Sequence, residues 1–432
     1  MSRVQNRLHG PRSAGRSSGL IAALDIGCSK ITCLIAKRDP VGPERFTLLG
    51  GGCQQSRGFE AGSITDMEGL ERAIRLAVED AERQAGERIG RVILGVTGPK
   101  LVCRLVSAQV STGGGTVDAR AVKRVQLAAV SKVAMKGHQI LSAHPVAFRV
   151  DDQDGVRDPR GMHGQRLGVL VSAVLAPESV LLNLIECVGR AHLEVERLVP
   201  AAIATGMGTL IDDERENGAI CFDFGAGVTT AAVYMNGVPA WLGLVPAGGA
   251  HVTSDIAQGL GTTFAAAERL KTVHGVTDPG APGHAERIDC PKLGDDGRLH
   301  AARMPRQDLS NIIAPRIEET LEILLGLMSA SALKKVLPRR GVLTGGASQI
   351  SGLRDTAKSV LSMPVRLGRP INADRLGEGF ANPAFSTAAG LLTYHIADLP
   401  DALRASAQVG AAGMAGDGSI VKKAFFWMRE NF

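Results

Sequence analysis

Short apolar runs alternate with amphipathic stretches along most of the chain. In residues 67–87, Leu70, Ile74 and Val78 fall on one side of a 3.6-residue period and charged residues fall on the other, which predicts a helix. A second helix is expected near 118–136, followed by a polar surface loop at 151–165. Apolar runs rich in β-branched residues predict strands at 20–26, 30–36, 91–98 and 167–175. This alternation predicts an α/β architecture.

The second half of the chain repeats this alternation from about residue 205. Residues 218–237 form two apolar runs separated by an acid and a glycine turn. Helical stretches are expected near 251–273 and 309–337, with a loop-rich segment at 275–305 between them. Residues 341–353 combine a strand, a glycine turn and a helix start.

An internal repeat relates the two halves. ALDIGCSKITCLIA (23–36) and CFDFGAGVTTAAVY (221–234) align without a gap, so that Asp25 matches Asp223 at a spacing of 198 residues. Each hairpin turn offers backbone N–H groups to an anion, and each first strand ends in an acid that could hold hydrated Mg²⁺. Two such hairpins facing each other would clamp a polyphosphate between two lobes. The alternative is a pair of ordinary hairpins with Asp-x-Gly turns.

Composition excludes several other classes of protein. The 432 residues carry a net charge of +6, which is concentrated at the two ends: residues 1–19 carry +4 and residues 418–432 carry +2. A basic body wrapped by nucleic acid is therefore not expected, and no nucleic-acid partner is predicted. The seven cysteines are widely spaced without a CxxC pair, which argues against a disulfide framework or a zinc site. The absence of a Gly-Lys dipeptide excludes a P-loop, and the incomplete G-x-G motifs exclude a dinucleotide-binding fingerprint.

Three motifs resemble the actin–Hsp70–sugar kinase ATPase superfamily. LDIGCSK (24–30) is similar to its first phosphate motif, FDFGAGVTT (222–230) to its second, and VLTGGAS (342–348) to its adenosine motif. The resemblance implies a two-lobed actin-like ATPase fold, built from duplicated RNase H-like lobes with ATP in the cleft between them.

The same resemblance implies roles for individual residues, with ATP and Mg²⁺ as cofactors. Asp25 and Asp223 would hold Mg²⁺ through water, and the stretch AAAERLK would place Glu268 and Lys271 at the ribose. The alternative for that last pair is an exposed salt bridge between residues three apart. The turns would contact the phosphates and the adenosine through Gly27, Ser29, Lys30, Gly225, Gly227, Thr229, Gly248, Gly345 and Gly346.

No catalytic residue is identified. The Hsp70 branch carries a Glu before the Pro-x-Ala-Ala type stretch between the lobes, whereas Val199 stands there in LVPAAIATG. We therefore expect ATP to act mainly as a ligand, with slow or absent turnover.

The last residues, SIVKKAFFWMRENF (419–432), differ in character from the rest of the chain. Most of their apolar side chains fall on one arc of a helix, with the charged residues opposite, and an Ala/Gly-rich stretch precedes them. This pattern favours a helix that lies on an anionic membrane, and the alternative is a helix docked on the protein's own core. The anchor residues would be Ile420, Val421, Lys422, Lys423, Phe425, Trp427, Met428 and Phe432.

Together, these features resemble the FtsA family of bacterial division proteins, most specifically in residues 248–271, 312–325 and 418–432. The resemblance implies that the chain tethers FtsZ filaments to the cytoplasmic face of the inner membrane at the division septum. It also implies self-association into filaments or oligomers, and contacts with later division proteins through an inserted subdomain, called 1C. The C-terminal peptide of FtsZ would bind subdomain 2B, where Arg303 and Arg306 are candidate contacts; the alternative is that both are ordinary solvated surface arginines.

The resemblance also implies a division of the chain into subdomains. Subdomain 1A would comprise 20–98, 179–204 and 373–400, with the small α+β subdomain 1C inserted at 99–178. Subdomain 2A would comprise 205–251 and 313–372, with 2B at 252–312. A disordered basic tail (1–19), a flexible linker (401–417) and the amphipathic helix (418–432) complete the chain. Two alternatives stay open: an adaptor similar to PilM of another membrane machine, and a sugar-kinase-type phosphotransferase.

Overall fold

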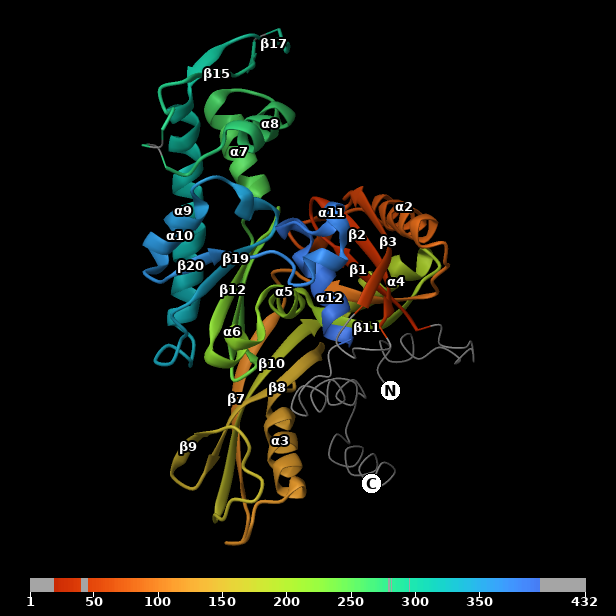
Figure 1. The fold of residues 1–432 in the computed structure, drawn as a ribbon, viewed down its shortest axis with the longest axis vertical. Coiled ribbons are helices and arrows are strands. Elements are labelled where there is room, and N and C mark those ends of the chain that lie inside the picture. Colours follow the sequence, from red (N-terminus) through yellow and green to blue (C-terminus); the bar gives the residue numbers. More distant parts are fainter. Residues whose placement is uncertain (1–18, 40–45, 279, 281, 295, 397–432) are drawn as a thin grey trace.

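The computed structural model describes residues 19–39, 46–278, 280, 282–294 and 296–396. The expected linker and amphipathic helix, and all of the basic tail except its last residue, lie outside the described residues. Two lobes stand side by side, a third unit lies below them, and helices with small hairpins lie above the second lobe (Figure 1).

The first lobe is built on a five-stranded sheet in the order β11-β6-β1-β2-β3. Strands β1, β2 and β3 pair antiparallel, whereas β1, β6 and β11 pair parallel. The bounds are β1 Leu20–Ile26, β2 Lys30–Arg38, β3 Phe46–Gln55, β6 Arg91–Val96 and β11 Glu194–Pro200.

The second lobe repeats this topology. Its sheet has the order β14-β13-β12-β19-β20, again with three strands paired antiparallel and the remaining pairs parallel. The bounds are β12 Ala219–Phe224, β13 Thr229–Met235, β14 Val238–Val245, β19 Gly341–Thr344 and β20 Val365–Leu367. Strand β12 occupies the place of β1, so the structure confirms that the two aligned sequence segments are equivalent hairpins.

Helices cover both faces of each sheet because each strand alternates apolar residues between its faces. Helices α5 and α12 lie between the two sheets and share one core with both, while α2 and α4 cover the outer face of the first sheet. Helices α9 and α10 cover the outer face of the second sheet, and α6 precedes β12. The bounds are α2 Met67–Ala85, α4 Glu178–Arg190, α5 Ala201–Thr209, α6 Asp212–Asn217, α9 Arg306–Ser329, α10 Leu353–Leu361 and α12 Ser386–Ile396.

The inserted unit is a four-stranded antiparallel sheet, β7-β10-β8-β9, with one helix on one face. Its elements are β7 Val102–Ser111, α3 Ala119–Val133, β8 His138–Val150, β9 Gln153–Val156 and β10 Arg166–Pro177. Strand β9 lies within 151–165, where only a loop was expected. Its sequence, QDGV, lacks an alternating pattern, and it forms by pairing with Phe148 and Val150 of β8.

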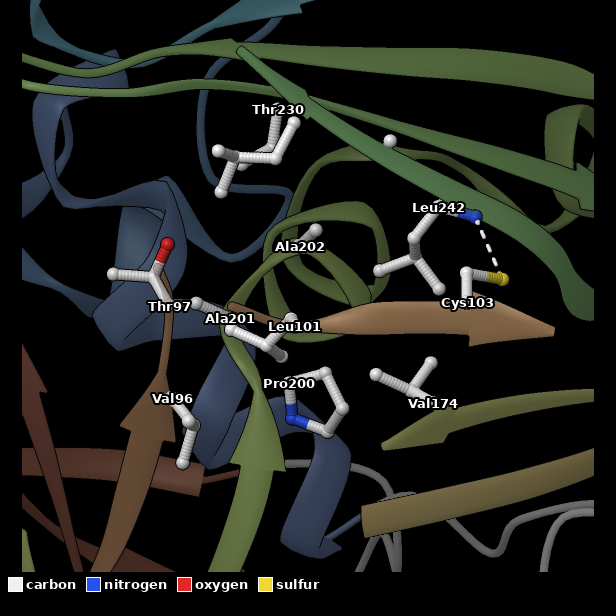
Figure 2. Close-up of a pocket in the computed structure, with 12 residues that line it drawn as sticks. Val96, Thr97, Leu101, Cys103, Val174, Pro200, Ala201, Ala202, Thr230 and Leu242 are labelled. Carbon is white, nitrogen blue, oxygen red and sulfur yellow. Dashed lines mark hydrogen bonds between the residues drawn. The ribbon is translucent and has the colours of Figure 1, made fainter. Parts of the chain in front are cut away.

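The other face of the inserted sheet packs against the second lobe. Val146 of β8 belongs to the core of that lobe, and Leu105 and Leu170 pack against the same core. The backbone N–H of Leu242 in β14 donates to the Cys103 thiol of β7 at 3.4 Å, and both residues line a cavity of about 50 Å³ (Figure 2). The inserted unit is therefore packed against the second lobe although its chain leaves and rejoins the first.

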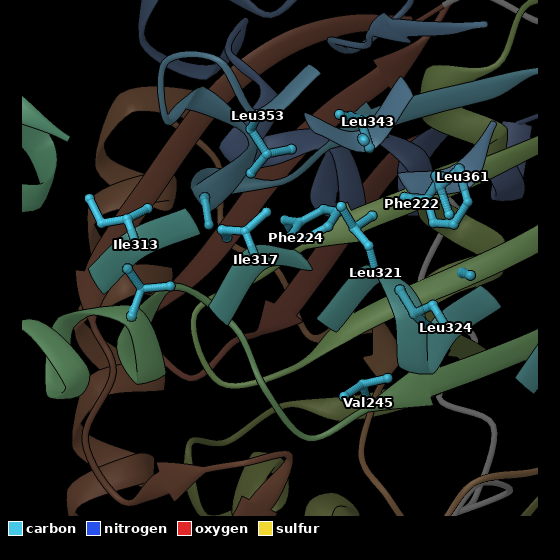
Figure 3. Packing of buried hydrophobic residues seen from close by; sticks show 14 of the residues in the cluster. Phe222, Phe224, Val245, Ile313, Ile317, Leu321, Leu324, Leu343, Leu353 and Leu361 are labelled. Carbon is cyan, nitrogen blue, oxygen red and sulfur yellow. The ribbon is translucent and has the colours of Figure 1, made fainter. Parts of the chain in front are cut away.

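The second-lobe core is a continuous apolar layer between the sheet and α9 (Figure 3). Phe222 and Phe224 of β12 meet Ile317 and Leu321 of α9, which are all fully buried or nearly so. Helix α9 ends at Ser329, earlier than the expected end near 337. Beyond it, the Ser331 hydroxyl accepts a hydrogen bond from the N–H of Leu333 at 3.2 Å, a local bond of the kind that competes with helix continuation.

Above the second lobe, the expected helical stretch 251–273 is two helices, α7 Gly249–Leu260 and α8 Phe264–His274. They separate because Gly261 ends α7 in the left-handed conformation (φ 61°) and Thr263 caps α8. The loop-rich segment holds two small hairpins, β15 Arg287–Asp289 with β18 Arg303–Pro305, and β16 Lys292–Leu293 with β17 Leu299–His300.

Short elements complete the described chain. They are β4 Phe59–Glu60, β5 Ser63–Ile64, η1 Gly346–Gln349, η2 Ala373–Arg375, α11 Gly377–Phe380 and η3 Pro383–Phe385. Among the described helices, none combines the length and apolarity needed to cross a membrane.

Candidate functional site

The two equivalent hairpins turn with the same geometry. The N–H of Gly27 donates to the Lys30 carbonyl at 3.0 Å, and the N–H of Gly225 donates to the Val228 carbonyl at 3.1 Å. A Cβ at Gly27 would lie 2.9 Å from the Lys30 oxygen, and a Cβ at Gly225 would lie 2.7 Å from the Val228 oxygen. Glycine is therefore required by the turns themselves.

The two turns meet at the floor of a cleft between the lobes. A Cβ at Gly227 would lie 2.7 Å from the Cys28 sulfur, so the turns are in direct contact. The start of α7 is attached to the second turn, because the N–H of Gly249 donates to the Gly225 carbonyl at 2.9 Å. The cleft has a volume of about 840 Å³, and its lining includes both turns, α7, α8 and the Gly345–Gly346 turn.

Asp25 and Asp223 are the acids at the ends of β1 and β12, and both line this cleft. Burial, and next the neighbouring Asp223, raise the pKa of Asp25 from 3.8 to about 7, while Lys30 acts against the shift. Burial also raises the pKa of Asp223. The pair is therefore an electrostatically unfavourable arrangement that a bound cation would relieve.

Two threonines hold Asp223 in place. The hydroxyl of Thr205 in α5 donates to Asp223 Oδ2 at 3.0 Å, and that of Thr387 in α12 donates to the same oxygen at 3.2 Å. These hydrogen bonds favour the ionised carboxylate and partly offset the effect of burial on its pKa. Neither threonine was predicted from the sequence, because they lie far from Asp223 in the chain and no motif marks them.

Lys30 and Ser29 lie at the first turn, and both line the cleft. The ammonium of Lys30 lies 4.3 Å from the centre of the Phe385 ring. Burial lowers the pKa of Lys30, and the charge of Asp25 is the largest effect that raises this pKa. A cation at this position suits a bound phosphate.

Glu268 and Lys271 both line the cleft, and they also bind each other. Lys271 Nζ lies 2.7 Å from Glu268 Oε2 and donates to the Thr253 hydroxyl at 2.8 Å and the Gly249 carbonyl at 2.9 Å. The Lys271 side chain is only 10% exposed, whereas that of Glu268 is 47% exposed. Lys271 therefore joins α8 to α7, and Glu268 keeps surface open to the cleft.

The two glycines of the VLTGGAS motif differ in whether the surrounding structure leaves space for a side chain. Gly345 has φ 88°, and a Cβ there would lie 2.2 Å from Asp223 Oδ1, so a side chain is excluded by the acid itself. At Gly346 an added Cβ would meet only the Ala384 Cβ at 3.7 Å, which is an ordinary contact. Both glycines line the cleft, but only the first is required by the fold.

Two expected nucleotide contacts do not reach the cleft. The Thr229 hydroxyl is buried and donates to the Ala247 carbonyl at 2.7 Å, while the next residue, Thr230, lines the cleft instead. Gly248 lies beneath the second turn, with its Cβ position 2.5 Å from the Gly225 oxygen. The alternation of strand β13 is the physical reason for the first miss, because neighbouring residues face opposite sides.

The two candidate FtsZ contacts occupy different places. Arg303 lies on the β15–β18 hairpin and pairs with Asp289 at 2.7 Å, with both side chains well exposed. Arg306 begins α9, donates to the His274 carbonyl at 2.9 Å and lines the cleft. Both arginines therefore lie at or beside the β15–β18 hairpin, but Arg303 is on the exposed hairpin whereas Arg306 lines the cleft.

The residues of the cleft fit a nucleotide polyphosphate with a hydrated divalent cation. Two half-buried carboxylates lie at the floor, glycine turns bring backbone close to the cavity, and Lys30 supplies a positive charge. Other lining residues that the sequence did not identify include Gln55, Ser56, Thr97, Phe264, Thr272, Val273 and Gln349. They come from the ends of several elements, so no local pattern could mark them.

Comparison with known proteins places this geometry in a family. The family model described as "Cell division protein FtsA" matches residues 220–390, and "SHS2 domain inserted in FTSA" matches residues 98–175. The chain is 38% identical to cell division protein FtsA of Rhizobium meliloti (strain 1021), over 96% of each chain. It is 31% identical to cell division protein FtsA of Escherichia coli (strain K12), over 96% of this chain and 98% of that one.

Solved structures show the same fold at low identity. A PilM-PilN type IV pilus biogenesis complex matches with a TM-score of 0.61 and 16% identity, covering 87% of this chain and 98% of that one. MreB5 of Spiroplasma citri bound to ADP matches with a TM-score of 0.51 and 11% identity, covering 86% and 95%. The fold is thus the two-lobed actin-like ATPase fold with an inserted SHS2 domain, as expected from the motifs. On its near full-length identity to curated relatives, the chain belongs to the FtsA family.

Proposed function

We propose that this chain is an ATP-binding cell division protein that tethers FtsZ filaments to the inner face of the cytoplasmic membrane at the septum. Membership of the FtsA family supports the role in division. The observation that carries the nucleotide part is the pair of equivalent hairpins, which place Asp25 and Asp223 together at the floor of the cleft.

ATP would bind with its phosphates against the two turns. Asp25 and Asp223 would hold Mg²⁺ through water, with Thr205 and Thr387 fixing Asp223, and Lys30 would face a phosphate. The bound cation would supply the charge that stabilises both half-buried carboxylates. Glu268, which lines the cleft and retains exposed surface, would accept hydrogen bonds from the ribose.

Membrane attachment would come from residues 419–432. Their apolar arc and flanking lysines suit an anionic bilayer, and many chains in one filament would bind with avidity although one short helix binds weakly. In this proposal the FtsZ peptide binds near the hairpins at 287–305, and the inserted subdomain serves self-association and later division proteins.

Flotation with anionic vesicles tests the attachment. We expect the full chain to float and a chain ending at Asp417 to stay in solution, while both bind Mg-ATP equally. Replacing Trp427 or Phe425 by Glu should have the same effect as truncation. Equal flotation of both chains would contradict the proposal, and loss of ATP binding on truncation would mean that the segment is part of the fold.

The adaptor alternative rests on the fold alone, at 16% identity to the PilM–PilN complex. Binding of the FtsZ C-terminal peptide separates the two functions, because a pilus-type adaptor has no use for that peptide. ATP consumption stimulated by a small hydroxylated substrate would instead indicate the sugar-kinase alternative.

A further inference from the structure

The cation that faces the cleft from the first lobe rests on an aromatic ring. The ammonium of Lys30 lies 4.3 Å from the centre of the Phe385 ring, a distance at which the face of the ring attracts a positive charge. The charge of Asp25 raises the pKa of Lys30, but among the residues that the structure describes no carboxylate comes within ion-pair distance of the ammonium. A lysine side chain has a flexible four-carbon stem, so the ring is the contact that gives its charged end a direction.

The Phe385 ring is held in place by the first lobe. Phe385 ends the short helix η3, and its ring meets that of Phe380 at 5.0 Å and 70°, the edge-to-face arrangement that aromatic pairs favour. Phe380 lies directly on the backbone of β3, because a Cβ at Gly51 would lie 2.3 Å from the Phe380 ring. Gly51 pairs with Leu34 of β2, the strand that begins at Lys30, so one sheet supports both the ring and the cation.

The chain on both sides of this ring also binds the second lobe. The N–H of Gly345 donates to the Pro383 carbonyl at 3.2 Å, and the Thr387 hydroxyl donates to Asp223 Oδ2 at 3.2 Å. We call residues 380–387 the bridging segment, because it contacts the first lobe through aromatic rings and the second lobe through hydrogen bonds. The bridging segment therefore connects the cation of one lobe to the acid of the other.

The Phe385 ring can affect a nucleotide only through Lys30. Lys30, Pro383 and Ala384 line the cleft. Phe385 is half-buried and is not among the described residues that line it. Its side chain carries no charge and no hydrogen-bonding group that a phosphate could contact. A role for this ring in nucleotide binding must therefore pass through the position of the ammonium.

We propose that Phe385 is a positioning residue, which holds the ammonium of Lys30 toward the cleft before a nucleotide enters it. This inference rests on the proposed binding of ATP in that cleft. Fixing a side chain with many rotamers costs free energy on binding, and a side chain that is already held does not incur that cost again. The ring should therefore strengthen nucleotide binding without touching the nucleotide.

The test compares four variants of the full chain. Phe385→Leu and Phe385→Met remove the ring and keep an apolar side chain, whereas Phe385→Tyr keeps the ring. Phe148→Leu replaces a buried aromatic residue in the core of the inserted subdomain and is the control for a general loss of stability. Titration calorimetry measures Mg-ATP binding. Peptide mass spectrometry measures the rate at which an amine-specific reagent labels Lys30 without nucleotide, and thermal melts verify that each variant is folded.

We expect both ringless variants to bind Mg-ATP about 2- to 10-fold more weakly than the wild-type chain, which is the cost of fixing one lysine side chain on binding. Lys30 should also be labelled faster in these variants, because its ammonium no longer rests on a ring. Phe385→Tyr and Phe148→Leu should keep the wild-type binding and labelling. In a Lys30→Gln background, Phe385→Leu should have no further effect on Mg-ATP binding, since no ammonium is left to position.

Three results would overturn the proposal. The first is Mg-ATP binding that is not weaker, or Lys30 labelling that is not faster, in both ringless variants. The second is an equal weakening of binding by Phe385→Leu in the wild-type and Lys30→Gln backgrounds, and the third is the same loss in Phe148→Leu. Failure of the unmodified chain to bind Mg-ATP would instead overturn the proposed nucleotide binding, and the labelling of Lys30 would still decide whether Phe385 holds it.

Discussion

At the scale of residues, the half-buried acids Asp25 and Asp223 determine the chemistry of the cleft. Both pKa values are raised chiefly by burial, which disfavours the ionised forms that would hold a cation. Thr205 and Thr387 act against this shift at Asp223 by donating to its carboxylate. A bound divalent cation would stabilise the ionised forms of both acids.

The Asp25→Asn substitution should therefore stabilise the nucleotide-free protein at neutral pH. The pKa of Asp25 is about 7 when folded and 3.8 otherwise, so the wild-type chain loses stability as the pH rises through this window. We expect the variant to gain up to about 4 kcal/mol over wild type above pH 7, and little near pH 4. Thermal unfolding without Mg²⁺ or nucleotide at several pH values measures this. A difference that does not change with pH would contradict the account.

The Asp223→Asn substitution should instead weaken nucleotide binding. The variant keeps the shape of the side chain but loses the charge that would hold hydrated Mg²⁺, so we expect a loss of about tenfold or more in ATP affinity. Titration calorimetry with Mg²⁺ and with a chelator measures the effect, and Asp355→Asn at an exposed pair is the control. Unchanged affinity in Asp223→Asn would remove this acid from the site.

At the scale of elements, the packing of the inserted subdomain connects parts that are distant in the chain. The alternate residues of β10 contribute to different cores: Ala176 to the first lobe, Val174 to the layer between the lobes, and Leu170 to the second lobe. The small cavity beside Cys103 shares Thr97, Ala201 and Thr230 with the nucleotide cleft. The cavity beside the inserted sheet and the cleft are therefore lined in part by the same residues.

A pair of core substitutions tests this connection. Val146→Ala removes a β8 side chain from the second-lobe core, and Val125→Ala removes an α3 side chain from the core of the inserted subdomain. Each should cost about 1–3 kcal/mol of stability. We expect hydrogen exchange to accelerate in β14 for Val146→Ala only. Unchanged exchange in β14 for Val146→Ala would contradict this contact, and equal acceleration in both variants would mean that the effect is a general loss of stability and not one transmitted through Val146.

At the scale of the whole molecule, the duplication explains how much the sequence could predict. The hairpins were predicted from their own residues, because the acid, the glycines and the flanking apolar runs lie within fourteen residues of one another. The sequence could not predict the hydrogen bonds of Thr205 and Thr387 to Asp223, or the contacts of β10, since these depend on how distant elements pack. Thr229 was predicted to face the cleft, but its neighbour Thr230 does so instead, because successive residues of a strand face opposite sides. Strand β9 forms only by pairing with β8, which its own sequence does not indicate.

The cleft should bind ATP with little turnover. Val199, fully buried at the end of β11, stands where the Hsp70 branch carries an acid, and the acids that line the cleft are Asp25, Asp223 and Glu268. We expect steady phosphate release from the pure protein well below about 1 s⁻¹, the lower range of conventional enzymes. Phosphate release at or above that rate would contradict the expectation of slow turnover, provided that the Asp223→Asn variant, prepared in the same way, does not release phosphate.

The most direct test of the whole account is a reconstitution with FtsZ. Anionic vesicles, FtsZ with GTP, and this chain with Mg-ATP are mixed, and the FtsZ that floats with the vesicles is measured. We predict that FtsZ floats with the full chain and stays in solution with the chain ending at Asp417. Equal flotation of FtsZ with both chains, or none with the full chain, would contradict the proposed tether.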